Sequence, residues 1–271
     1  GWRVTGTSRS AEGVEQIRAQ GFEAARFDGT APSDEVACAL ETASHLLVSA
    51  PPGDDGDPVL EQHRSDIVSA PHLKWIGYLS TIGVYGDRAG AWVDETTPEA
   101  PASQRSKRRL TAEQSWLAIA RPGTGTAVQV FRLAGIYGPG RSAIDQVRSG
   151  RARRIVRPGQ VFNRIHVEDI ATTLAAAIAT GGAHHIYNVT DDEPAAPQDV
   201  IVHAARLLGV PPPPEVPIEE AELSPMAQSF YSELKRVRND RIKQDLGVRL
   251  GYPTYREGLA AVLAASRNGE R

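Results

Sequence analysis

The chain has 271 residues, of which 41% are hydrophobic and 23% are charged, and its formal net charge is −3. This composition is ordinary for a globular protein, and the near-neutral charge excludes a general nucleic-acid binder. The single cysteine excludes an internal disulfide, and no apolar run approaches the roughly 20 residues of a membrane-spanning helix, so we expect a cytoplasmic protein without nucleic-acid or membrane partners.

Strand and helix patterns alternate through the first two thirds of the chain. Ser10 is typical of a helix N-cap, and Gly21 is typical of the glycine that closes the same helix. Cys38 lies in the next helical pattern, where we expect a small buried side chain. We expect strands at 3–7, 23–27, 45–49, 75–79 and 128–132, and further helices at 34–40, 59–69 and 103–117. This alternation predicts a parallel sheet with helices on both faces.

The regular alternation of strand and helix patterns ends after about residue 139. A strand and a helix at 165–178 and a strand at 186–189 continue the sheet pattern, whereas short helices at 239–246 and 255–265 follow a run of prolines. The sequence therefore predicts a large α/β domain made of residues 1–136 plus 160–190. We expect a smaller lobe made of residues 137–159 plus 191–271.

Several short motifs occur in a fixed order along the chain. The segment LSTIGVYGD (79–87) contains Thr81 and Tyr85, and SQRSKRRLTAE (103–113) contains Ser103 and Lys107. Any one of these motifs would be a weak signal, but their order and spacing together are specific. The later motifs are FRLAGIYGPG at 131–140, RIHVEDIA at 164–171, IYNV at 186–189, RVRNDRIKQDLG at 236–247 and YPTYREGL at 252–259.

This set of motifs resembles the extended short-chain dehydrogenases/reductases, that is, the NAD-dependent epimerase/dehydratase family, over essentially the whole chain. Ser103 and Lys107, together with Ala50-Pro51-Pro52 after an apolar strand, resemble its atypical, YeeZ-like branch. The resemblance implies a Rossmann-type doubly wound parallel sheet in the large domain and a smaller C-terminal substrate lobe. Residues 1–136 plus 160–190 are then the dinucleotide-binding domain, and 137–159 plus 191–271 are the substrate lobe.

The N-terminal sequence departs from this family pattern. The opening residues, GWRVTGTSRS, look like the second strand of a dinucleotide-binding fold, and no Gly-x-Gly-x-x-Gly occurs anywhere in the chain. That glycine-rich turn normally brings the pyrophosphate to a helix N-terminus. We expect one further strand–helix unit of about 20–25 residues to precede this sequence. A rearranged N-terminus is the alternative.

Two residues match the catalytic pattern of the family. By resemblance, the hydroxyl of Thr81 hydrogen-bonds the substrate oxygen, although a threonine at the end of a strand can also satisfy local backbone groups. By resemblance, Lys107 binds the nicotinamide ribose and lowers the pKa of the catalytic acid; it is also one member of a basic run.

The family places a tyrosine four residues before this lysine, and here that position holds Ser103. Serine lacks the reach and the acidity of a phenol, and general acid catalysis typically contributes about 10²- to 10⁴-fold. Tyr85 and Tyr137 are candidate replacements, but each precedes a glycine in a turn, where a tyrosine more often packs structurally.

Cofactor-binding residues follow from the same resemblance. Arg9, after the first strand, favours the 2′-phosphate of NADP, where an acidic residue would favour NAD; the alternative is an arginine in solvent. Asp28 ends the next strand, where the family contacts adenine, although aspartate is also a common turn residue. We expect no metal site. The expected cofactor-binding residues are Ser8, Arg9, Asp28, Ala50, Pro51, Lys107 and Ile136.

The sequence thus predicts an NAD(P)-dependent oxidoreductase or epimerase that acts on a small polar substrate, with a nucleotide sugar as one candidate. Its catalytic residues would be Thr81, Lys107 and Ser103, with NADP, or else NAD, as the cofactor. The alternative is a non-catalytic NADP-binding sensor or scaffold, which the serine at position 103 favours. The oligomeric state stays open, and the resemblance implies a homodimer through the helix at 103–117.

Overall fold

The computed structural model describes residues 1–120, 125–181 and 185–269, and the chain forms two compact units. The first unit contains Gly1–Ser80 and Arg108–Val130, and the second contains Thr81–Lys107 and Phe131–Arg271. The two lobes expected from the sequence were defined by their functions, dinucleotide binding and substrate binding, and the compact units are defined by packing. The boundaries of the lobes therefore stay a prediction. None of the helices in the described residues is long and apolar enough to cross a bilayer.

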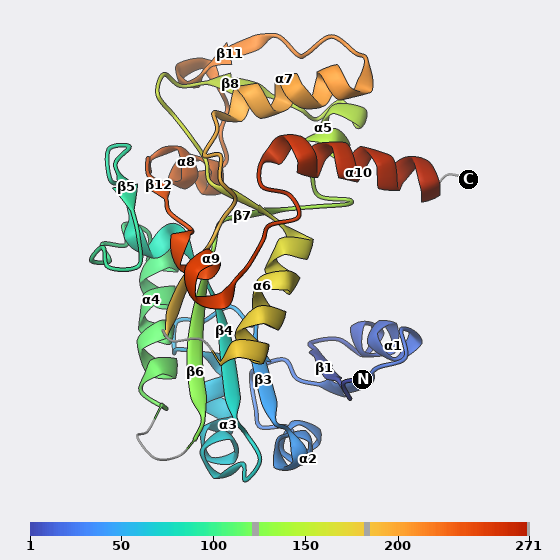
Figure 1. Cartoon of the computed structure of the whole chain (residues 1–271), viewed down its shortest axis with the longest axis vertical. Helices are drawn as coiled ribbons and strands as arrows, with labels where there is room; N and C mark the ends of the chain where they lie inside the picture. The colour runs from blue at the N-terminus through green and yellow to red at the C-terminus, as the bar shows by residue number, and fades with distance from the viewer. Residues whose placement is uncertain (121–124, 182–184, 270–271) are drawn as a thin grey trace. The chain divides into compact units, whose positions relative to one another are not determined.

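The first unit confirms the expected alternation of strands and helices (Figure 1). Ser10 caps its first helix and Ser33 the second, because each side chain accepts a hydrogen bond from a backbone N–H of the first turn. The elements are β1 (Thr5–Ser8), α1 (Ala11–Ala19), β2 (Glu23–Arg26), α2 (Asp34–Thr42), β3 (His45–Val48), α3 (Pro58–Ser69) and β4 (Trp75–Thr81), followed by parts of α4 (Gln104–Leu117) and β6 (Ala127–Leu133).

The strands form a parallel sheet, as expected for the Rossmann type. One sheet has the order β10-β6-β4-β3, where β10 is Ile186–Val189, and His45 of β3 lies opposite Trp75 of β4. β1 and β2 form a separate parallel pair, with Thr5 opposite Glu23. In the described part of the chain, β10 and β3 are the edge strands of the four-stranded sheet.

The core of the first unit is mainly aliphatic and includes the buried aromatic side chains of Trp75, Tyr78 and Trp116. Tyr78 of β4 stacks on Trp116 of α4, with ring centroids 6.1 Å apart, and the indole of Trp75 donates a hydrogen bond to Gln129 of β6. Cys38 is exposed on α2, so the expectation that it is buried is wrong. Leu40 is the buried residue of this short helix, which presents one apolar stripe to the core.

The second unit contains short parallel strand pairs and a helical cluster. The strands pair as β7 with β9, β8 with β11 and β5 with β12. Figure 1 shows α5, α7 and α10 gathered together, and Ile144, Leu259 and Tyr255 are among the buried residues of their shared core. The elements are η1 (Ile82–Tyr85), β5 (Trp92–Val93), β7 (Gly135–Tyr137), α5 (Ala143–Arg148), β8 (Arg154–Val156), β9 (Arg164–His166), α6 (Val167–Thr180), β10, α7 (Pro197–Leu208), β11 (Glu215–Pro217), η2 (Ile218–Glu220), α8 (Pro225–Tyr231), β12 (Arg236–Val237), α9 (Asp240–Leu246) and α10 (Tyr255–Gly269).

Candidate active site

Thr81 ends β4 and begins the 3₁₀ turn η1. The backbone N–H of Gly83 donates to the Thr81 hydroxyl oxygen at 3.1 Å, so the side chain caps this turn. Gly86 ends the turn with φ 65°, and a Cβ there would collide with the carbonyl oxygen of Ala100. A buried apolar strand followed by a glycine-terminated turn thus holds the hydroxyl of Thr81 in one orientation.

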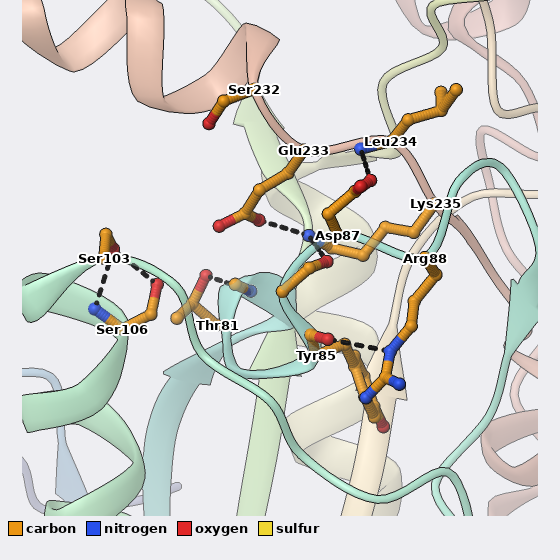
Figure 2. Close-up of polar contacts among 12 residues, drawn as sticks. Thr81, Tyr85, Asp87, Arg88, Ser103, Ser106, Ser232, Glu233, Leu234 and Lys235 are labelled. Carbon is orange, nitrogen blue, oxygen red and sulfur yellow. Dashed lines mark hydrogen bonds and ion pairs between the residues drawn. The ribbon is translucent and has the colours of Figure 1, made fainter.

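Ser103 lies beside this turn through Ser106. The Ser103 hydroxyl donates to the Ser106 hydroxyl at 2.9 Å and accepts from the Ser106 backbone N–H at 3.1 Å, so Ser103 caps α4. A Cβ on Gly83 would lie 2.8 Å from the Ser106 hydroxyl oxygen and 3.4 Å from that of Thr81. The structure therefore gathers three hydroxyl groups around Gly83, those of Thr81, Ser103 and Ser106, which we call the hydroxyl cluster (Figure 2).

Lys107 follows the hydroxyl cluster on α4. Its backbone N–H donates to the carbonyl of Ser103 at 3.0 Å, and its side chain is exposed. Residues four apart share one face of a helix, so Ser103 and Lys107 face the same way at the start of α4. This is the register that the family motif requires.

The two tyrosines that could replace the missing phenol are structural. The Tyr85 hydroxyl donates to the Asn188 side chain at 2.9 Å, and the guanidinium of Arg132 lies 4.9 Å from the centre of its ring. The Tyr137 hydroxyl donates to the carbonyl of Thr254 at 3.4 Å. Burial raises the pKa of both phenols above the usual range of tyrosine. Neither tyrosine is therefore suited to proton transfer at the hydroxyl cluster.

A buried ion pair lies at the other end of η1, and the sequence analysis missed it. The Lys235 ammonium donates to the carbonyl of Gly86 at 2.9 Å and to the carboxylate of Glu233 at 2.5 Å (Figure 2). The side chains of Lys235 and Glu233 are only 7% and 13% exposed. The two residues immediately precede β12 at a spacing of two, which on an extended chain places both on one face. That spacing is the sequence signal that could have revealed them.

Backbone hydrogen bonds fix this ion pair against the segment that follows η1. The carboxylate of Asp87 accepts from the Leu234 N–H at 2.8 Å, and this bond is the largest cause of the lowered pKa of Asp87. The Arg88 N–H donates to the carbonyl of Leu234 at 3.0 Å, and the Arg88 side chain donates to the carbonyl of Tyr85 at 2.9 Å. Hydrogen bonds thus join the segment after η1 to the segment before β12, although the two are about 150 residues apart in the sequence.

The expected cofactor residues Ser8 and Arg9 lie where β1 leads into α1. Arg9 is exposed, and Ser10 accepts from the Gly13 N–H at 3.1 Å. A Cβ on Gly13 would collide with the Ser8 hydroxyl, so Ser8 packs directly against the first turn of the helix. Hydroxyl groups and a guanidinium at a helix N-terminus are a donor set that suits a phosphate group.

Asp28, Ala50 and Pro51 lie in the first unit, at the ends of β2 and β3. The Asp28 carboxylate accepts from the hydroxyl of Thr30 at 2.7 Å and from its N–H at 3.0 Å, and the hydroxyl is the largest cause of the lowered pKa of Asp28. Asp28 is thus occupied in a local turn. The carbonyl of Ala50 accepts from the Arg109 guanidinium at 3.4 Å, and Pro51 is exposed.

Ile136 lies in the second unit, in the middle of β7 and opposite Ile165 of β9. The expected cofactor residues therefore divide into a first group on the first unit and a second group, Lys107 and Ile136, on the second unit. The expected catalytic residues, Thr81, Ser103 and Lys107, all belong to the second unit.

Comparison with known sequences agrees with this geometry. The model of the NAD dependent epimerase/dehydratase family matches residues 67–190. The protein YeeZ of Escherichia coli (strain K12) is 34% identical over 269 residues, which cover 93% of this chain and 89% of YeeZ. A 3-diazoavenalumate denitrifying reductase of Streptomyces sp. is 33% identical over 247 residues, which cover 86% of this chain and 69% of that reductase. The chain belongs to the NAD-dependent epimerase/dehydratase family.

Solved structures show the same fold. A functionally unknown conserved protein of Silicibacter pomeroyi DSS has 52% sequence identity and a TM-score of 0.87, and the match covers 98% of this chain and 91% of that protein. The UDP-glucuronic acid 4-epimerase of Bacillus cereus, solved with NAD, has a TM-score of 0.74 at 17% identity, covering 100% of this chain and 92% of the epimerase. At that identity the likeness shows the fold alone.

Proposed function

We propose that the protein is an NAD(P)-dependent oxidoreductase or epimerase that acts on a carbonyl or hydroxyl group of a small polar substrate. The observation that carries this proposal is the hydroxyl cluster at the carboxyl end of β4. The Thr81 oxygen already accepts a bond from Gly83, so its hydrogen is free to be donated to a substrate oxygen. A bound nicotinamide dinucleotide would supply or accept the hydride.

The residues of the chain would divide the work of such a reaction. Thr81 orients and polarises the substrate oxygen, and Lys107, on the same face of α4 as Ser103, binds the nicotinamide ribose. Ser8 and Arg9, beside the first turn of α1, bind the 2′-phosphate of NADP, while Asp28, Ala50, Pro51 and Ile136 line the remainder of the dinucleotide. The relatives named above support a nicotinamide cofactor, and Arg9 favours NADP over NAD.

The test is the nicotinamide absorbance of the protein with defined compounds. NAD and NADP are combined with UDP-glucuronic acid or UDP-glucose, and NADH and NADPH with 3-diazoavenalumate. Because an epimerase returns the hydride to its substrate, the nucleotide sugars are also separated by chromatography after the reaction. Conversion that disappears in Thr81→Val supports the proposal, and no conversion of any of the three compounds contradicts it.

A second candidate is a dinucleotide-binding sensor or scaffold without turnover. The observation that favours it is Ser103, whose hydroxyl is engaged in capping α4 and in the bond to Ser106. In that case NADPH would bind and raise the melting temperature, no compound would be converted, and Ser103→Tyr would introduce turnover. We also propose a cytoplasmic location, in which the exposed thiol of Cys38 stays reduced.

A further inference from the structure

The proposed reaction includes a proton transfer, and the residues named so far do not include the proton donor for it. Reduction of a carbonyl needs a proton donor near the substrate oxygen, and in the described residues neither Tyr85 nor Tyr137 offers one, because both phenols are hydrogen-bonded in the core. The Ser103 hydroxyl is engaged with Ser106 and is too weak an acid to replace a phenol. With Lys107 assigned to the nicotinamide ribose, a proton donor on another element would complete the site.

Lys235 has the chemistry that the site needs. A lysine ammonium carries three N–H donors, of which the bonds to Gly86 and Glu233 use two. The third is available to a substrate. As residue types, lysine and tyrosine have similar reference pKa values in water, about 10, so an ammonium can replace a phenol as a proton donor.

The position of Lys235 relative to Thr81 is set by η1. Thr81 caps the start of this turn, and the carbonyl that binds the Lys235 ammonium belongs to Gly86, which ends it. The two residues are five positions apart, which corresponds to about 10 Å at a rise of about 2 Å per residue. Figure 2 shows the Glu233–Lys235 pair and the hydroxyl cluster around the same turn. Both groups belong to the second unit, so a substrate held at Thr81 would lie on the unit that carries the Lys235 ammonium.

We propose that Lys235, held by Glu233 and by the carbonyl of Gly86, is the proton donor of the active site in place of the missing phenol. This inference rests on the proposed oxidoreductase function. A bound reduced dinucleotide would supply the hydride to the carbonyl carbon. As the π pair of the C=O bond moves to the oxygen, this oxygen takes a proton from the Lys235 ammonium. The lysine amine then takes a proton from water on the side of the more exposed Glu233, and oxidation of an alcohol runs in reverse.

Two alternative roles for Lys235 fit the structure less well. A site for an anionic substrate group would need a net positive charge, but the carboxylates of Glu233 and Asp87 both lie close to this ammonium. A purely structural pair is not required for stability, since buried ion pairs are often no more stabilising than well-packed apolar side chains. Proton donation uses both the ammonium and its paired carboxylate.

The decisive variant is Lys235→Arg, because arginine keeps the positive charge and the hydrogen bonds but does not release a proton. The matched control is Lys243→Arg, whose parent residue forms an ion pair with Asp192 on the same unit. We expect Lys235→Arg to lose about 10²- to 10⁴-fold in kcat, with the KM and the affinity for NADPH unchanged. Its melting temperature should stay within about 2 °C of the parent, equivalent to less than about 1 kcal/mol.

A measurement that does not depend on turnover accompanies this assay. The chain has four lysines, Lys74, Lys107, Lys235 and Lys243, so NMR of protein labelled with ¹⁵N at the lysine side chains is simple to assign with the Lys→Arg variants. Whichever of UDP-glucuronic acid, UDP-glucose or 3-diazoavenalumate the parent converts should shift the Lys235 signal and leave the Lys243 signal in place.

The possible results separate this inference from the function on which it rests. An active parent with an inactive, folded Lys235→Arg and a substrate-sensitive Lys235 signal supports the inference. An active parent whose Lys235→Arg variant is equally active overturns the inference and leaves the proposed function standing. A parent that converts none of the three compounds overturns both. If Lys235→Arg and Glu233→Gln lose activity only in proportion to lost melting temperature, the pair is structural and the inference is wrong.

Discussion

At the scale of single residues, the hydroxyl of Thr81 has two tasks that substitution can separate. It caps η1 through Gly83, and in the proposed reaction it donates to the substrate oxygen. We expect Thr81→Ser to retain both tasks. Thr81→Val should lose the cap, at about 1 kcal/mol, and should lower kcat/KM at least about tenfold through the missing donor. Urea denaturation and the conversion assay measure the two effects.

The control for Thr81 is a threonine outside the site. Thr172 lies on the exposed face of α6, where its hydroxyl donates to the carbonyl of Glu168, so Thr172→Val should leave conversion unchanged. Full activity of Thr81→Val would show that Thr81 is only a cap.

Asp191 makes stability depend on pH. Burial raises its pKa from the usual 3.8 to about 8, against the opposing effect of Arg164. The folded state therefore favours the protonated carboxyl, and the stability that this group contributes is fully present below about pH 4 and is lost as the pH rises towards about 8. Asp191→Asn removes this loss and keeps an oxygen that accepts the bond from the Glu193 N–H.

The measurement for Asp191 is the free energy of unfolding at two pH values. The free energy of unfolding of Asp191→Asn, measured relative to that of the parent, should be higher at about pH 9 than at about pH 5. The increase should be roughly 1.4 kcal/mol for each pH unit between about pH 5 and the pKa of Asp191 in the folded protein. A parent that gains stability relative to the variant as the pH rises would show that Arg164 outweighs burial.

The positions of the candidate site residues on strands and helices were predictable from the sequence to the extent that they depend on local patterns. Thr81 at a strand end, and Ser103 four residues before Lys107 on a helix, follow from short-range spacing. Glu233 and Lys235 are also close in sequence, but their contact with η1 could not be found in this way. The Lys235 ammonium meets the carbonyl of Gly86 across a sequence separation of about 150 residues, and only the tertiary fold brings them together.

At the scale of elements, the turn η1 depends on a glycine at its end. Gly86 has φ 65° and faces the carbonyl oxygen of Ala100, whereas Gly140 has φ 76° with open space around it. Alanine in the left-handed region costs roughly 1–2 kcal/mol, which is the effect we expect for Gly140→Ala. Gly86 has ψ −155°, in a region essentially restricted to glycine, where another residue costs about 1–3 kcal/mol. Gly86→Ala adds a steric clash that costs about 1–3 kcal/mol more.

Urea denaturation of the two alanine variants separates backbone strain from steric contact. Gly86→Ala should also reduce conversion, because its carbonyl binds Lys235. Equal destabilisation by the two substitutions would mean that the backbone at Ala100 moves away from the new Cβ at position 86 without loss of stability.

Helices were predictable where a polar cap marks their start. α1 begins after Ser10 and α2 after Ser33, and both side chains form the capping bond. α7 has Ala196 at its N-cap position without a side-chain bond, so its start is marked by Pro197 at the first helical position and not by a polar cap. The two-residue strands β5 and β12 exist only through their pairing with each other, and no local pattern specifies such a pair.

At the scale of the whole molecule, the alternation of strands and helices and the order of the motifs were enough to predict the fold class and the family. The compact units divide the chain at Ser80, Lys107 and Val130, and these boundaries could not be predicted from the sequence. The predicted functional lobes stay a separate prediction. α4 and β6 each continue from one unit into the other, so a change of lobe leaves no break in the periodicity of the sequence.

Cofactor preference is a property of the whole protein that thermal unfolding can report. A ligand at about 100 times its Kd stabilises the folded state by about 2.7 kcal/mol, which raises the melting temperature by several degrees. Arg9 is exposed beside α1 and suits a 2′-phosphate, so NADPH should raise the melting temperature more than NADH at equal concentration. Arg9→Glu should reverse this order, because its carboxylate repels the phosphate and accepts a bond from the ribose of NADH. Arg3→Gln, which removes an exposed arginine paired with Glu23, is the matched control and should leave the order unchanged. Equal shifts with the two dinucleotides, unaffected by Arg9→Glu, would place the 2′ position of the ribose away from β1.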